Sequence, residues 1–260
     1  MSEQFGPVTV TVADGVATVL VDSPPVNAMG TAVIDGLGRA AACVGPDHGV
    51  RVVVLAGAGT AAFMAGADIG EFEALRAEPG AMDEHSLRAR AVFDAWQALP
   101  QPLIAAVQAS AVGGGLEIAL ICDLIVADPG ARFGLPEVKL GLIPGGGGTQ
   151  RLPARIGTAA AKELLFLGSL VDAQRALALG LVNRVSEPGG ALAAAHELAA
   201  RIAALPRVAV TAAKRAVDGA VLGPALDRER EIFLETFASK DFEEGFAAFL
   251  EKRKPVFSHE

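Results

Sequence analysis

The sequence lacks the features that mark secreted and membrane proteins. It contains only two cysteines, Cys43 and Cys122, both within apolar runs, so we expect a reduced protein of the cytoplasm and no disulfide scaffold. The N-terminal stretch MSEQFGPVTVTVADG has neither a basic segment nor a long apolar one, which predicts no signal peptide. Glycine, proline or charge interrupts the apolar runs well before ~18 residues, so we expect no membrane-spanning helix.

Basic residues are also few. Lys and Arg total 22 against 30 Asp and Glu, which gives a formal net charge of −8 and a pI of about 5.1. This balance, without a basic stripe, argues against a nucleic-acid partner, and an anionic ligand would need local donors. The histidines His48, His85, His196 and His259 share no metal-like spacing with a cysteine, so no metal site is expected. The absence of a G-x-S-x-G motif argues against a serine hydrolase of the α/β-hydrolase type.

Apolar residues, by contrast, make up 52% of the 260 residues. This is ample for one large domain, or for one domain with a smaller appendage. Residues 8–22 alternate around Asp14-Gly15, which predicts a β-hairpin. Continuous aliphatic runs predict strands covered on both faces; they lie at 51–57, 103–108 and 123–128.

Helical patterns fill the gaps between these strands. They cover residues 31–44, where Thr31 is the expected cap, then 83–98 and 115–121. An alternation of strand and helix in this order predicts a largely parallel α/β architecture.

Helices dominate beyond about residue 148, although Asp172 caps one of them before a last short strand at 181–185. We therefore predict an α/β core with the active site over residues 1–200 and a C-terminal helical region over 201–260. That region carries more apolar side chains than a small appendage can bury by itself, which predicts an oligomer. These side chains are Ile232, Phe233, Phe237, Phe246 and Phe249.

The stretch AVGGGLEIALICD, residues 111–123, contains the first candidate site. Glycines between a strand and a helix allow a tight turn and a close approach of ligand to backbone, where the first helical N–H groups suit an oxyanion or a phosphate. The alternative is a packing turn. Glu117 interrupts the apolar run that follows, and a buried carboxylate suggests use. The alternative is a surface glutamate that compensates the helix dipole.

Three further features accompany this turn. Glu137 follows the strand after Glu117, and a turn of the chain there can bring the two carboxylates close together. Two carboxylates at one cavity can act as general acid and general base. The alternative is that Glu137 is an ordinary loop glutamate. The glycines at 145–148 are followed by no Lys-Ser or Lys-Thr and form no P-loop, but allow close passage to a ligand or to the helix of Glu117. Backbone N–H groups of the small-residue loop 63–72 can form an oxyanion hole together with those of the glycine turn. The alternative is an ordinary loop between a strand and a helix, with Asp68 as the helix cap.

The sequence as a whole closely resembles the enoyl-CoA hydratase/isomerase (crotonase) family. The resemblance rests on motifs in the right order along essentially the whole chain: PPVNAM, VVVLAGAG…FMAGADI, PLIAAV…VGGGLEIALICDLIVAD, ARFGLPEVKLGLIPGGGGTQRLPARIG, DAQRALALGLVNRV and FEEGFAAFLEKRKPVF. It implies a core of repeated ββα units wound into a superhelix. It also implies a C-terminal helical region that builds trimers, commonly paired into hexamers.

The resemblance also implies roles for individual residues. The oxyanion hole for the thioester carbonyl would be the backbone N–H groups of Ala67 and Gly114. Glu117 matches the glutamate that helps to activate water, and Glu137 matches the one that moves the proton at the carbon next to the carbonyl. Positions that line the coenzyme A groove are matched by Pro25, Val26, Ala65, Asp68 and Ile69, and C-terminal positions offered to a neighbouring subunit's coenzyme A by Phe249 and Lys252.

The implied activity is hydration of a 2-enoyl-CoA thioester to 3-hydroxyacyl-CoA, as a short-chain type of enoyl-CoA hydratase does in fatty-acid β-oxidation. Coenzyme A is part of the substrate, and no separate cofactor is expected. Three alternatives stay open: an enoyl-CoA isomerase, a non-catalytic coenzyme A-binding member, and a hydrolase or decarboxylase of the same superfamily. Gly70 stands where many relatives carry a lysine, and the loop 76–86 has no clear counterpart, so the sequence leaves acyl-chain length open.

Overall fold

Two β-sheets form the scaffold of the protein in the computed structural model, which describes residues 2–47, 49–218 and 223–256. The larger sheet has the strand order β1-β2-β3-β4-β6-β8-β11. Its strands are β1 (Ser2–Phe5), β2 (Val8–Ala13), β3 (Val16–Val21), β4 (Val52–Gly57), β6 (Leu103–Val107), β8 (Leu124–Ala127) and β11 (Arg184–Val185). Neighbours among β1, β2 and β3 are antiparallel, and every later pair is parallel. The predicted hairpin and the largely parallel architecture are both confirmed.

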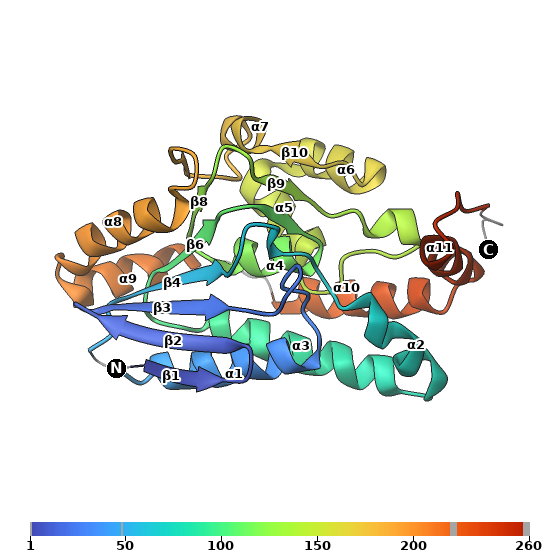
Figure 1. The fold of residues 1–260 in the computed structure, drawn as a ribbon, viewed down its shortest axis with the longest axis horizontal. Helices are drawn as coiled ribbons and strands as arrows, with labels where there is room; N and C mark the ends of the chain where they lie inside the picture. Colours follow the sequence, from blue (N-terminus) through green and yellow to red (C-terminus); the bar gives the residue numbers. More distant parts are fainter. Residues whose placement is uncertain (1, 48, 219–222, 257–260) are drawn as a thin grey trace.

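Helices surround the sheets and dominate the second half of the chain (Figure 1). They are α1 (Thr31–Val44), α2 (Ile69–Ala77), α3 (Ala81–Gln97), α4 (Gly114–Ile121), the 3₁₀ helix η1 (Glu137–Leu140), α5 (Gly148–Ile156), α6 (Thr158–Leu167), α7 (Ala173–Ala178), α8 (Ala191–Ala203), α9 (Arg207–Asp218), α10 (Gly223–Phe237) and α11 (Lys240–Leu250). Among the described residues, no helix is long and apolar enough to cross a membrane. His48 and His259 lie outside the described residues.

The central strand β4 is buried on both faces, as its aliphatic run predicts. Because side chains alternate along a strand, Val53 and Leu55 join the core shared with α1, α3 and α4. Val52 and Val54 point the other way and pack with α8. The chain therefore covers the larger sheet with N-terminal helices on one face and with α8 on the other. The predicted boundary between the two regions, at residue 200, falls within α8. The division into two regions stays a prediction.

A smaller sheet, with the order β10-β9-β7-β5, was not predicted. Its strands have only two or three residues each, which is too short to show an alternating pattern; they are β5 (Ala62–Met64), β7 (Ser110–Val112), β9 (Arg132–Gly134) and β10 (Val171–Asp172). The predicted strand at 181–185 is likewise shorter, because β11 contains only its last two residues. The small sheet matters for function because the candidate motifs follow its strands.

The start of α1 differs from the prediction. Gly30 is the N-cap and offers no side-chain hydrogen bond, and Thr31 is the first helical residue. The N–H and hydroxyl of Thr31 instead donate to the carboxylate of Glu71 in α2. The prediction of Thr31 as cap was wrong because a cap from another helix cannot be read from local sequence.

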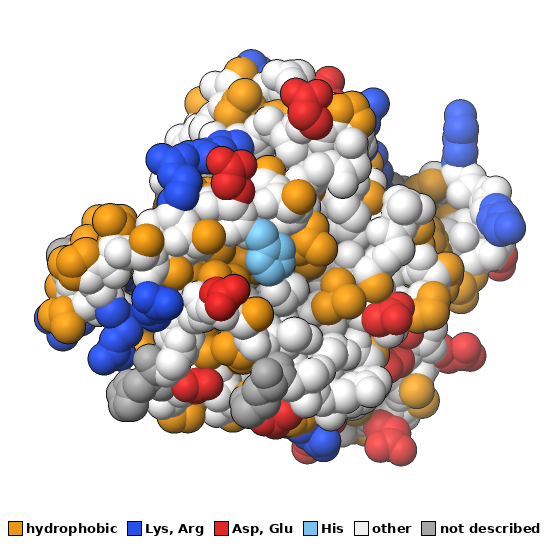
Figure 2. Space-filling view, turned by 60° about the vertical axis from the view of Figure 1, so that its left-hand side comes forward, with side chains coloured by type: hydrophobic (Ala, Val, Ile, Leu, Met, Phe, Trp, Pro, Cys, Tyr) orange, Lys and Arg blue, Asp and Glu red, His pale blue; other side chains and the backbone are white. Residues whose placement is uncertain are grey.

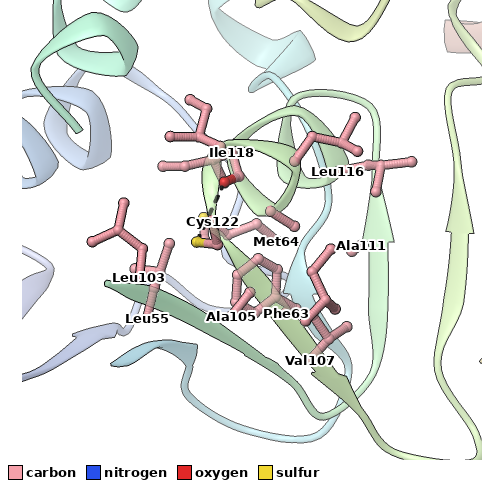
Figure 3. Packing of buried hydrophobic residues seen from close by; sticks show 14 of the residues in the cluster. Leu55, Phe63, Met64, Leu103, Ala105, Val107, Ala111, Leu116, Ile118 and Cys122 are labelled. Carbon is pink, nitrogen blue, oxygen red and sulfur yellow. Dashed lines mark hydrogen bonds between the residues drawn. The ribbon is translucent and has the colours of Figure 1, made fainter. Parts of the chain in front are cut away.

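Both cysteines are free thiols. Cys122 lies at the end of α4, where α4 packs against β4, β5 and β6 through large apolar side chains (Figure 3). Its Sγ donates a long hydrogen bond to the carbonyl oxygen of Ile118 at 3.7 Å. Burial raises the pKa of the Cys122 thiol to about 12, so the thiol stays protonated near neutral pH.

The C-terminal helices bury their aromatic residues within the chain. Phe246 is 5% exposed, and Phe233 and Phe237 pack beside it against Phe72 of α2. These three side chains are thus covered within one chain, with α2 of the core contributing Phe72, and they do not themselves require an oligomer; Phe249, at 52% exposed, remains uncovered. The helix α11 also packs against η1, so this aromatic cluster supports the segment that begins with Glu137.

We predict that Phe242→Ala lowers the free energy of unfolding by about 3–5 kcal/mol. Phe242 is fully buried, and its ring centroid lies 4.5 Å from that of Phe237. The matched control is Phe166→Ala, because Phe166 is 71% exposed and should change stability by only about 0.5 kcal/mol. Urea unfolding at one fixed protein concentration, followed through the single Trp96, gives both values. Equal losses in the two variants would contradict the prediction.

Candidate active site

The turn between β7 and α4 consists of Gly113, Gly114 and Gly115. Gly113 has φ 57° and ψ −132°, a conformation that glycine adopts without strain. A Cβ atom at Gly115 would overlap the carbonyl oxygen of Met64, so the start of α4 lies directly against β5. The triplet therefore lets two backbone segments approach more closely than side chains would allow.

Two backbone N–H groups lie close together at this contact. The nitrogen of Gly114 is 3.5 Å from the position that a Cβ would take at Gly66, and the nitrogen of Ala67 is 3.8 Å from the corresponding position at Gly114. Neither N–H donates a hydrogen bond to another of the described residues. Two such donors side by side can bind one carbonyl oxygen and stabilise negative charge on it.

Glu117 lies in the first turn of α4 and is only 4% exposed. Its Oε1 accepts hydrogen bonds from the N–H groups of Gly146 and Gly148, each at 2.8 Å. Gly148 is the first residue of α5, so the positive end of that helix also faces the carboxylate. These donors offset the cost of burying it. The alternative interpretation of Glu117 as a surface glutamate is therefore wrong.

The glycines at 145–148 are needed for this contact. A Cβ at Gly146 would lie 2.7 Å from Oε2 of Glu117 and 2.6 Å from Phe93 of α3. A Cβ at Gly145 would lie 3.0 Å from the ring of Phe233 in α10. The loop thus brings its main chain against the helix of Glu117, which is one of the two positions that the sequence predicts for it.

Arg151 supports the same loop, and sequence reasoning missed it. Its side chain is 6% exposed. Its Nη1 donates to the carbonyl oxygen of Gly146 at 2.7 Å, and its Nη2 donates to Oε1 of Gln97 at 2.6 Å. The sequence signal is weak, because a single arginine beside the apolar Leu152 does not reveal a buried guanidinium.

Glu137 reaches the glycine turn from another segment. It is the first residue of η1, just after β9, and its Oε1 lies 3.2 Å from the position of a Cβ at Gly113. Oε2 of Glu117 lies 3.8 Å from the position of a Cβ at Gly114. The structure therefore brings both carboxylates against consecutive residues of one turn, beside the two N–H donors.

The residues expected in a coenzyme A groove come from two loops. Pro25 and Val26 lie between β3 and α1, and Pro25 is exposed. Ala65, Asp68 and Ile69 follow β5 and are partly buried. Asp68 is the N-cap of α2, where its Oδ1 accepts from the N–H two residues on at 2.9 Å. The capping alternative is thus confirmed for Asp68, and it is compatible with a place beside a ligand.

Asn27 ties the loop of Pro25 and Val26 to the β4–β5 turn and to β5, and sequence reasoning missed it. Its side chain is 3% exposed, and its Nδ2 donates to the carbonyl oxygens of Ala58, Ala62 and Phe63 at 2.9, 3.0 and 3.2 Å. Its Oδ1 accepts from the N–H of Ser23 at 2.9 Å. The signal in the sequence was a single amide between apolar neighbours in PPVNAM.

Phe249 and Lys252 are not brought to the glycine turn within one chain. Both lie at the end of α11 and are exposed. In Figure 1, α11 lies at the right-hand edge, whereas α4 lies near the centre. The family resemblance implies that these residues contact a ligand bound to a neighbouring subunit, and this stays a prediction.

Two cavities lie away from the glycine turn. One of about 720 Å³ runs between the ends of α4 and α5 and the helix α9. Its charged side chains already bind one another or the backbone: Lys214 pairs with Asp123 at 2.7 Å, and Arg155 donates to the carbonyl oxygen of Cys122. No three His, Cys, Asp or Glu side chains of the described residues are placed to hold a metal ion. The groups gathered at the glycine turn, two carboxylates and two N–H donors, are suited to acid–base catalysis beside a carbonyl oxygen.

Comparison with known proteins identifies close relatives. A family model described as enoyl-CoA hydratase/isomerase matches residues 11–260. The short-chain-enoyl-CoA hydratase of Clostridium acetobutylicum is 44% identical over 166 residues, which cover 63% of this chain and 64% of that protein. The crotonyl-CoA hydratase of Syntrophomonas wolfei is 42% identical over 169 residues, which cover 64% of this chain and 65% of that protein. Both alignments span slightly less than two thirds of the relative's length.

The similarity in structure extends over nearly the whole chain. The crystal structure of carnitinyl-CoA hydratase from Mycobacterium avium matches with a TM-score of 0.88 at 37% identity, and the match covers 98% of this chain and 99% of that one. The predicted crotonase-like α/β core with a C-terminal helical region is therefore confirmed. Since the family model spans almost all of the sequence, the chain belongs to the enoyl-CoA hydratase/isomerase family.

Proposed function

We propose that the protein is an enoyl-CoA hydratase, which adds water across the 2,3-double bond of a 2-enoyl-CoA thioester. One observation carries this proposal: Glu117 and Glu137 lie against Gly113 and Gly114, beside N–H groups that bind no other described residue. Relatives named as hydratases of short-chain and crotonyl-CoA thioesters support it. The reaction is of the type used in fatty-acid β-oxidation.

The mechanism assigns one task to each group. The N–H groups of Ala67 and Gly114 bind the thioester carbonyl oxygen. Glu117 takes a proton from water as the water oxygen bonds to C3, and the electron pair of the double bond moves to the carbonyl oxygen as an enolate. Glu137 gives a proton to C2 as the enolate collapses to 3-hydroxyacyl-CoA. Glu117 then releases its proton to solvent and Glu137 takes one up, which restores the enzyme.

The buried Glu117 favours hydration over the alternatives. An isomerase that shifts a double bond needs one carboxylate at C2, which Glu137 supplies, and has no use for a second one that activates water. A non-catalytic coenzyme A-binding member has no need to keep either carboxylate. Two loop N–H groups hold Glu117 in place, and this arrangement suits a second proton-transfer group.

The coenzyme A moiety would lie along the loop between β3 and α1 and the loop that follows β5. Pro25 and Val26 would contribute one side, and Ala65, Asp68 and Ile69 the other. Gly70 has no side chain to contact a phosphate, so any such contact must come from another residue.

We further infer that the protein acts as a trimer or a pair of trimers. Apolar side chains on the C-terminal helices remain exposed in the single chain: Val208 and Val217 of α9 are 76% and 79% exposed, and Leu250 of α11 is 56% exposed. On the face drawn in Figure 2, apolar side chains reach the surface at several places between charged ones. An assembly would cover such residues and would let Phe249 and Lys252 meet a neighbouring subunit's coenzyme A.

Glu117→Gln should lower the rate of crotonyl-CoA hydration by about 10²–10⁴-fold, because general acid–base groups typically contribute that much. The glutamine oxygen can still accept from Gly146 and Gly148, so the fold should persist. Binding of acyl-CoA should barely change, since the N–H donors are untouched. The fall of the enoyl thioester absorbance measures the rate.

The companion variant Glu137→Gln distinguishes hydratase from isomerase. It should stop hydration and also any migration of a 3-enoyl double bond, because both reactions move a proton at C2. Normal hydration by Glu117→Gln together with an inactive Glu137→Gln would refute the two-carboxylate mechanism and favour the isomerase.

Gly114→Pro should reduce turnover by about 10²–10³-fold, because proline removes one backbone donor of the oxyanion hole. Proline is tolerated at the first position of a helix, which Gly114 occupies in α4. Gly114→Ala is the matched control, because it keeps the N–H. Its methyl group would overlap the flexible end of Met29, while the Ala67 nitrogen and Oε2 of Glu117 stay at an ordinary contact distance of 3.8 Å. Equal rates in the two variants, both folded by circular dichroism, would make Gly114 a packing residue.

Sedimentation at micromolar concentration should give the mass of a trimer or a hexamer of the 26.5 kDa chain. The physical reason is the apolar area that the C-terminal helices leave exposed. A stable monomer under these conditions would refute the proposed assembly.

A further inference from the structure

We propose that Glu71 is a positioning residue of the oxyanion hole, which acts by fastening the start of α2 to the start of α1. The inference rests on the proposed function, because it assigns Glu71 the task of holding the N–H of Ala67 against that of Gly114. Glu71 itself would touch neither substrate nor reacting atoms.

The contact between the two helices is specific. Oε1 and Oε2 of Glu71 accept from the N–H of Thr31 at 3.0 and 3.1 Å, and Oε2 also accepts from its hydroxyl at 2.8 Å. A Cβ at Gly30 would lie 2.6 Å from Oε1 of Glu71. The N-cap of α1 is therefore a glycine without a side-chain oxygen, and a carboxylate from a helix 40 positions further along the chain takes over its task.

The fastened segments are the ones that carry the oxyanion donors. Met29, two residues before Thr31, bridges in parallel to Ala67, and its N–H donates to the carbonyl oxygen of Gly66 at 2.7 Å. The tip of the Met29 side chain also contacts Gly114. Residues 29–31 thus contact Ala67 on one side and Gly114 on the other, and Glu71 ties them to the helix that follows Ala67.

Other contacts of α2 join it to different elements. Ile69, Phe72 and Leu75 pack into the aromatic cluster with α10 and α11, and Arg76 pairs with Glu243 of α11. These contacts therefore do not hold α2 against residues 29–31. In α2, which is described throughout, Phe72 is the one buried residue, and Ala67 itself is exposed. In the first turn of α2, Asp68 caps the helix itself, whereas Glu71 forms hydrogen bonds to another element, at Thr31 of α1. Loss of the Glu71 carboxylate should let Ala67 drift from Gly114, and small misplacements of a catalytic group can cost up to about 100-fold in rate.

The experiment compares wild-type protein with Glu71→Ala, Thr31→Val and the double variant. Glu71→Gln keeps an acceptor for the Thr31 N–H and serves as the conservative rescue. Glu73→Ala is the control, since Glu73 lies on the same helix and is exposed. Each variant is tested for kcat and KM with crotonyl-CoA, and for the enolate absorbance of bound acetoacetyl-CoA. The enolate readout reports the oxyanion hole directly, because its donors stabilise the enolate over the ketone.

We expect Glu71→Ala to lower kcat by about 10–100-fold with little change in KM, and to lower the enolate fraction of bound acetoacetyl-CoA. Thr31→Val should have a smaller effect that adds nothing to Glu71→Ala, because both remove the same contact. Glu71→Gln and Glu73→Ala should keep most of the activity and of the enolate.

Three results would overturn the inference while leaving the proposed function intact. They are a wild-type kcat in Glu71→Ala, a lower kcat with an unchanged enolate fraction, and an equal loss in Glu73→Ala. If the wild-type protein neither hydrates crotonyl-CoA nor enolises acetoacetyl-CoA, and Gly114→Pro changes neither, the proposed function fails and the inference fails with it.

Discussion

The burial of one carboxylate, Glu117, is the constraint on which the rest of the site depends. An ionised group in an apolar core is costly unless hydrogen bonds replace its water. The protein replaces that water with the N–H groups of Gly146 and Gly148. Only glycine can bring these N–H groups so close, because a Cβ at Gly148 would lie 3.0 Å from Oε1 of Glu117. Arg151 stabilises the same loop, because its guanidinium donates a hydrogen bond to the carbonyl oxygen of Gly146.

The position of Glu117 also ties the carboxylate to the backbone donors. Glu117 and Gly114 lie in the same first turn of α4, so a bond that holds the carboxylate also orients the N–H at the start of the helix. The N–H of Glu117 donates to the carbonyl oxygen of Gly113 at 3.0 Å, which closes that turn. One carboxylate and one oxyanion donor thus depend on the same helix, and Glu137 approaches it from a segment supported by α11.

The sequence predicted those parts of the fold that repeat a pattern over several residues. The aliphatic run at 51–57 identified a strand buried on both faces, and Asp14-Gly15 identified the first hairpin. It could not predict the short strands β5, β7 and β9, because three residues show no period. Phe246 was misjudged for a different reason: its cover comes from Phe72, which lies far away in the sequence.

In the candidate site, too, the sequence revealed residues with an unusual local pattern and missed those whose partners are distant in the sequence. Glu117 was noticed because a charge in an apolar run is unusual, and Glu137, the glycine turn and the loop 63–72 were candidates beside it. The family resemblance then assigned the oxyanion donors to Ala67 and Gly114. The supporting groups Asn27 and Arg151 were missed, since their partners are main-chain carbonyl oxygens in other segments. A side-chain pattern carries no trace of a main-chain acceptor that becomes a neighbour only after folding.

This limit follows from how the site is made. Its oxyanion donors are backbone N–H groups, and the donors to Glu117 are backbone N–H groups as well. Any residue except proline carries such a group, so the sequence marks their places only by the glycines that let the segments approach. The specificity of the arrangement must then reside in the contacts that set the backbone path, such as the bridge between Met29 and Ala67. Residues with no direct part in the chemistry, such as Met29, therefore help to set the geometry of the site.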